Sequence, residues 1–196
     1  RGDNRMTTES TENLLIESKF ETLISKSKLY IKTRNEEDLI SLNEDIEDLK
    51  AKVSSSLENN ASGHNINYLT SLKLMLSILD KFTSSVVLMG KMKSKKPLYE
   101  QFDTKQMLDI LLPNIKCLIE CENWSENLDT KKLENDYAFI EALEDQNKRV
   151  LLTYLIQDWH NMDEVLNLLK IGEIYKNIAE KLVSLSLLTN YLQKQN

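Results

Sequence analysis

The sequence predicts an all-α protein, a bundle of about six helices that begins with an antiparallel helical hairpin. Its 196 residues include only four Gly and two Pro, too few turn-forming residues for a β-sandwich or a β-barrel. Doubly wound α/β folds also use glycine at their strand-to-helix turns. Apolar residues make up 41% of the chain and recur every three or four positions, which is the period of an amphipathic helix.

The N-terminal part is expected to contain a disordered lead-in, residues 1–10, and a helical hairpin, residues 11–58. The first helix of the hairpin runs from about Glu12 to Lys32, and Asn35 is a good N-terminal cap for the second helix. Apolar residues repeat along the second helix in steps of three and four: Leu39, Leu42, Ile46, Leu49 and Val53. Two such stripes joined by a short turn favour antiparallel packing.

Residues 59–196 are expected to form the main bundle, after a loop rich in Asn, Ser and Gly around residues 58–65. Residues 66–89 are apolar on nearly all sides, which is typical of a central helix, and Gly90 is a natural stop. A fourth helix is expected from about residue 103 to residue 119, with a kink or break near Leu112 because Pro113 lies inside it.

Two further helices complete the predicted bundle. Asp129 is a possible cap for one long helix, or two nearly collinear ones, ending by His160. The last helix, from Met162 to about Gln193, carries the longest heptad-like stripe in the chain. Its members are Leu168, Ile171, Tyr175, Ile178, Leu182, Leu185, Thr189 and Leu192.

The two long apolar stripes are the candidate partner-binding residues, because exposed apolar stripes are costly unless they are covered. The candidate residues are Leu39, Leu42, Ile46, Leu49, Leu168, Ile171, Tyr175, Ile178, Leu182, Leu185 and Leu192. The alternative is that both stripes close the core of the chain's own bundle. The partner is either another protein or a second copy of this chain.

Motifs of known catalytic or cofactor chemistry are absent from the sequence. There is no Gly-rich phosphate loop, no nucleophile elbow and no His-Glu-x-x-His zinc motif. His64 and His160 lack the acidic residue three positions earlier that di-iron bundles use. Cys117 and Cys121 are too few for a zinc site and are expected to be buried, inert thiols. We therefore expect no enzyme activity, catalytic residue, metal or cofactor.

The charge distribution limits the classes of partner. A net charge of −6 makes nucleic acid an unlikely partner, since binding it requires many Lys and Arg side chains. One basic patch, Lys91, Lys93, Lys95 and Lys96, is expected to be a solvated linker, a contact for an anionic partner or a nuclear-localisation signal. The longest uncharged apolar run, Leu182–Gln193, is shorter than the roughly 20 residues of a membrane span.

These observations predict a non-enzymatic helical interaction module, a scaffold or adaptor that is a subunit or fragment of a larger assembly. Its few cysteines favour an intracellular location, the cytoplasm or the nucleus, although Asn60 and Asn123 begin glycosylation sequons. Two alternatives stay open. One is a bundle that binds an apolar ligand or a lipid between its helices, and the other is a secreted or surface helical adhesin of a microbe. The residues resemble no particular family.

Overall fold

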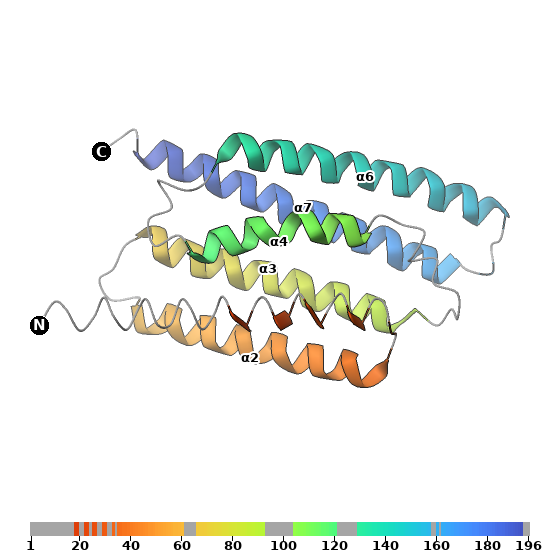
Figure 1. Cartoon of the computed structure of the whole chain (residues 1–196), viewed down its shortest axis with the longest axis horizontal. Helices are drawn as coiled ribbons and strands as arrows, with labels where there is room; N and C mark the ends of the chain where they lie inside the picture. Colours follow the sequence, from red (N-terminus) through yellow and green to blue (C-terminus); the bar gives the residue numbers. More distant parts are fainter. Residues whose placement is uncertain are drawn as a thin grey trace, which may run out of the picture. The chain divides into compact units, whose positions relative to one another are not determined.

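The described part of the chain is almost entirely helical and contains no strand. A computed structural model describes residues 18–19, 22–23, 25–26, 29–30, 33, 35–60, 66–92, 104–120, 129–157, 160 and 162–193. The helices whose bounds are defined are α2 (Glu36–Asn60), α3 (Ile66–Gly90), α4 (Thr104–Glu120), α6 (Thr130–Gln157) and α7 (Met162–Gln193) (Figure 1). The all-α prediction is confirmed. The six-helix arrangement and the hairpin stay predictions.

Two helices begin at the capping residues that the sequence indicates. The Asn35 side-chain oxygen accepts a hydrogen bond from the Glu37 backbone N–H at 3.2 Å, and α2 starts directly after it. The Asp129 carboxylate accepts one from the Lys132 backbone N–H at 3.1 Å, directly before α6. Each cap satisfies a backbone donor that has no partner within its helix. Helix α3 ends at Gly90, in agreement with the predicted role of this glycine as a helix stop.

Helix α4 continues through Pro113, so of the kink or break predicted near Leu112 the break is not observed, and the kink stays a prediction. The proline is exposed, and the next residue, Asn114, is buried. The Asn114 side-chain amide donates to the Ile110 carbonyl at 3.2 Å and to the Asp136 carboxylate of α6 at 2.7 Å. These two bonds tie the turn around the proline to the preceding turn and to a neighbouring helix, and so help α4 to continue.

The chain divides into two compact units whose boundaries fall inside α3 and α4. One unit comprises Arg1–Leu79 with Ile115–Leu128, and the other Asp80–Asn114 with Asp129–Asn196. The sequence instead suggested an internal boundary at residues 58–59, and that domain division stays a prediction. Among its described residues, the first unit buries the following apolar side chains: Leu23, Tyr30, Leu42, Ile46, Leu49, Val53, Met75, Ile78, Leu79 and Ile115.

The second unit is built around the pair α6 and α7, which lie side by side and run in opposite directions (Figure 1). Parts of α3 and α4 pack against this pair within the same unit. Phe82 of α3 and Tyr175 of α7 are both buried, and their ring centroids lie 6.3 Å apart with a tilt of 48° between the planes. Such tilted aromatic pairs add about 0.5–1.5 kcal/mol beyond the area they bury.

None of the described helices combines the length and the apolar content needed to cross a membrane.

Candidate interaction surface

Three contacts define the register of α6 against α7. A Cβ atom added at Gly172 would lie 3.5 Å from the Cγ atom of Glu144, so the two residues face each other. One turn further along α7, the Lys176 ammonium approaches the Glu144 carboxylate at 3.4 Å. Near the other end of the pair, the Asn190 amide donates to the Thr130 hydroxyl at 2.6 Å. In this antiparallel register the C-terminal end of α6 lies level with the N-terminal end of α7.

Glu144 is a charged residue at the centre of this helix pair, with only 1% of its surface exposed. Its two carboxylate oxygens face two ammonium groups: Lys148 lies 2.6 Å from Oε1 and Lys176 lies 3.4 Å from Oε2. The neighbouring Glu144 carboxylate raises the pKa of Lys148 above its ordinary value of 10.5. A buried carboxylate is costly unless it is paired, so these lysines favour the one alignment of α6 and α7 that keeps them beside it.

The C-terminal end of α6 exposes large apolar side chains on the side of the helix that faces away from α4. Successive residues of a helix are rotated by about 100°. Asp136, which contacts α4, therefore lies about 80° around the axis from Glu144 in one sense. Leu152 and Ile156 lie about 80° and 120° from Glu144 in the opposite sense, and they are 52% and 87% exposed.

The N-terminal end of α7 exposes apolar side chains on the same face of the helix pair. Tyr175, which contacts α3, lies about 60° from Gly172 in one sense. Met162 and Leu166 lie about 80° and 120° from Gly172 in the opposite sense, and both are exposed. Because the helices are antiparallel, equal rotations from their facing residues lead to the same side. We call Leu152, Ile156, Met162 and Leu166 the end patch.

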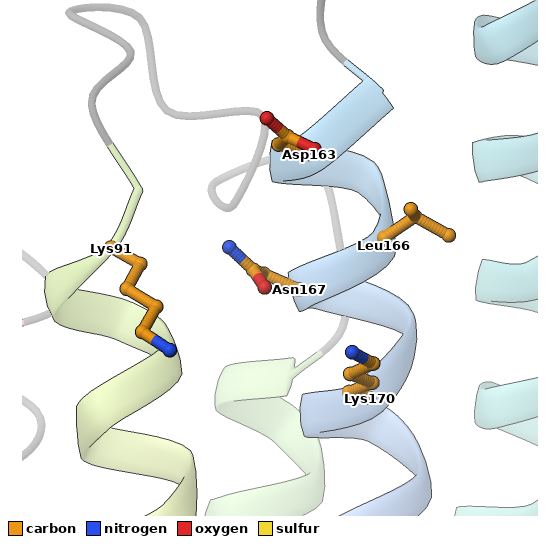
Figure 2. Close-up of a pocket in the computed structure, with 5 residues that line it drawn as sticks. All are labelled: Lys91, Asp163, Leu166, Asn167 and Lys170. Atoms are coloured by element: carbon orange, nitrogen blue, oxygen red, sulfur yellow. The ribbon is translucent and has the colours of Figure 1, made fainter.

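A pocket of about 420 Å³ borders the end patch, lined by Lys91, Asp163, Leu166, Asn167 and Lys170. Figure 2 shows Asn167 directed towards Lys91, at the end of α3, while Leu166 points away from Lys91. Lys170 and Asp163 are exposed, and neither forms an ion pair with any residue that the structure describes. The patch therefore combines an apolar centre with a rim that carries charges of both signs.

The predicted partner-binding stripes lie elsewhere, inside the chain. The buried members are Leu42, Ile46, Leu49, Leu168, Ile171, Tyr175, Ile178, Leu182 and Leu185. Leu39 is half-buried. Leu192 belongs to α7, but its side chain is outside the described residues. These side chains are buried in the chain on its own, and their binding to a partner stays a prediction.

The remaining candidates are described only in part. Lys91 of the basic patch is exposed and lines the pocket, whereas Lys93, Lys95 and Lys96 are outside the described residues. Cys117 lies in α4 without a described side chain, and Cys121 and His64 are also outside the described residues. Within the part of the chain that the structure describes, no group of three or more His, Cys, Asp and Glu side chains could hold a metal ion.

The end patch is the site that sequence reasoning missed. Leu152 and Ile156 lie in a run of apolar residues that begins at Val150, and such a run is equally consistent with a helix buried on all sides. Met162 and Leu166 precede the main stripe of α7 and were not part of it. Only the register of α6 against α7 shows that these four side chains share one exposed face.

Comparison of the chain with protein-family models and with curated proteins finds no match. The surface is therefore interpreted from its own chemistry.

Proposed function

We propose that this chain is a non-enzymatic helical interaction module, a subunit of a larger intracellular assembly, and that it binds protein through the end patch. The observation that supports this proposal is the gathering of four exposed large apolar side chains on one face, where Ile156 is 87% exposed. Covering apolar surface contributes about 25 cal/mol per Å². Contiguous exposed apolar surface with a polar rim is typical of binding sites for protein.

The anchor positions also have favourable geometry. Leu152 and Ile156 are one turn apart on α6, and Met162 and Leu166 are one turn apart on α7. Side chains at this spacing follow one another along one helix face, and two such rows side by side form a surface on which a partner helix could lie. The two ion pairs that the buried Glu144 carboxylate forms with Lys148 and Lys176 favour a fixed alignment of the two rows.

We also propose the finer architecture that the sequence predicts, a six-helix bundle with an N-terminal antiparallel hairpin. Lys19 pairs with Asp48 of α2, and Lys26 pairs with Asp45, so the partners occur in opposite orders along the two segments. Lys26 also donates to the Ser41 hydroxyl at 2.9 Å. The hydrogen bond from Lys19 lowers the pKa of Asp48, which favours the charged pair.

The alternative of an apolar-ligand or lipid bundle gains no support from the pocket at the end patch. Sites for apolar ligands are enclosed and mostly apolar, whereas this pocket is bordered mainly by charged and amide side chains. No observation favours the adhesin alternative.

The proposal is tested by affinity capture from an extract of the cells that make the protein. The bait is compared with a Leu152→Lys/Ile156→Lys variant, which places charge in the end patch. A matched control, Phe139→Lys/Val150→Lys, changes two exposed apolar residues of α6 that lie on the other side of that helix. The proposal expects partners that bind the bait and the control but not the patch variant.

Two results would count against the proposal. One is a set of captured proteins that is the same for all three baits, and the other is no specific capture by the unmodified chain. Circular dichroism of each bait checks that the three are equally helical. Lysine is the chosen replacement because a positive charge is tolerated near the C-terminal end of a helix.

A further inference from the structure

We infer that the partner of the end patch is a second copy of this chain, bound across a twofold axis that passes close to Leu166. This inference rests on the proposed interaction function and names its partner. It comes from the arrangement of two charged residues, Asp163 and Lys170, on either side of the exposed Leu166 in α7.

Asp163 and Lys170 are placed symmetrically about the apolar centre of α7. They are seven residues apart, which is two helical turns or about 10 Å along the axis, and they lie within about 20° of one another around it. The midpoint between them falls between Leu166 and Asn167. Both charged side chains are exposed, and neither has an ion-pair partner among the described residues.

This spacing is self-complementary. If the N-terminal segments of α7 from two copies cross in opposite directions near Leu166, Asp163 of each copy lies opposite Lys170 of the partner subunit. The same ion pair therefore forms twice, as a twofold interface requires. Leu166 of one copy then meets Leu166 of the partner subunit at the centre, and Met162 lies nearby on the same face.

The apolar part of the end patch completes the interface. Leu152 and Ile156 of α6 lie beside Leu166 on the same face of the helix pair, so two patches brought together cover eight large side chains. Four side chains per copy form a small apolar core in comparison with a standard stable interface, which buries about 1,200–2,000 Å² in total. The dimer is therefore expected to dissociate in the micromolar range, and its charges determine specificity more than affinity.

The test uses two single charge reversals of the full chain, measured by sedimentation velocity over a range of concentrations. Lys170→Glu places acid opposite acid at both contacts, and Asp163→Lys places lysine opposite lysine at both contacts. Each variant alone should dimerise at least about tenfold more weakly than the unmodified chain. Mixed together, they should form a heterodimer, because each contact then joins a lysine to an acidic residue.

Matched variants check that the effect is local and does not arise from unfolding. Glu180→Lys on α7 and Lys131→Glu on α6 reverse exposed charges outside the crossing and should leave dimerisation unchanged. The exchanged variant Asp163→Lys/Lys170→Asp carries the same residue at position 163 as one single variant, yet it should dimerise like the unmodified chain. Restored dimerisation would show that loss in the single variant did not come from a damaged helix.

Other outcomes would overturn the inference. An unmodified chain that is monomeric up to about 1 mM, well above a micromolar dissociation constant, would exclude a second copy as the partner. The proposed interaction function would then depend on the capture experiment alone. Dimerisation that the single reversals leave unchanged, or that mixing does not restore, would show that the copies meet through a different surface.

Discussion

The paired charges between α6 and α7 predict a marked asymmetry between two kinds of substitution. Replacing both Lys148 and Lys176 with methionine leaves the buried carboxylate of Glu144 without a counter-charge, at an expected cost of about 3 kcal/mol. Replacing Glu144 with leucine instead leaves two lysines whose side chains are already 43% and 23% exposed. Their ammonium groups can turn to water, so this change should cost less than about 1 kcal/mol.

The assay is urea denaturation at neutral pH, followed by far-ultraviolet circular dichroism. Thermal unfolding gives a second reading, because a chain of this size loses about 2–4 °C in midpoint per kcal/mol, or roughly 6–12 °C for the double lysine variant. The control is Lys131→Met/Lys132→Met, which removes two exposed charges from the same helix and should change little. Equal losses in the leucine variant and the double lysine variant would refute the asymmetry.

Three further predictions concern the same helix pair. Gly172→Ala should stabilise the chain by about 0.5–1 kcal/mol in urea denaturation, because a Cβ atom would only touch Glu144 at 3.5 Å; a loss of stability would mean that the two helices are closer. Asp129→Ala should cost about 1 kcal/mol, while Asp129→Asn, which can still accept from the Lys132 N–H, should cost much less; equal losses would exclude the cap. The raised pKa of Lys148 predicts a contribution to stability that is complete below the pKa of an unfolded lysine, and that is lost as the pH rises through the folded value. Denaturation midpoints should therefore fall above about pH 10.5, and less steeply in Glu144→Gln; parallel curves would contradict this.

Much of the helical architecture could be predicted because its signals are local. Asn35 and Asp129 have side chains that accept backbone hydrogen bonds, so they indicate helix starts without reference to the rest of the fold. The predicted span of the last helix, Met162 to about Gln193, agrees with α7. That α4 does not break at Pro113 could not be predicted locally, because the hydrogen bond from Asn114 to Asp136 joins residues far apart in sequence.

The surface could not be predicted because exposure depends on which helices become neighbours. The heptad stripe through Ile171 and Ile178 has the same pattern whether it is covered by its own chain or by a partner. In the apolar run of α6, Leu151 is buried while Leu152 and Ile156 are exposed. The sequence shows the rotation between these residues but not the side of α6 on which α4 and α7 lie, and that side decides which of them a partner can reach.

The most direct measurement of the end patch as the meeting surface is disulfide trapping at its centre. Leu166→Cys is introduced into a chain that carries Cys117→Ser and Cys121→Ser, and a second chain carries Glu180→Cys instead. Two cysteines can bond only when their Cα atoms approach within about 7 Å. Under mild oxidation at micromolar concentration, position 166 should form covalent dimers at least about tenfold faster than position 180, a ratio set by proximity. Equal rates at the two positions, or no dimer from position 166, would contradict binding through this surface.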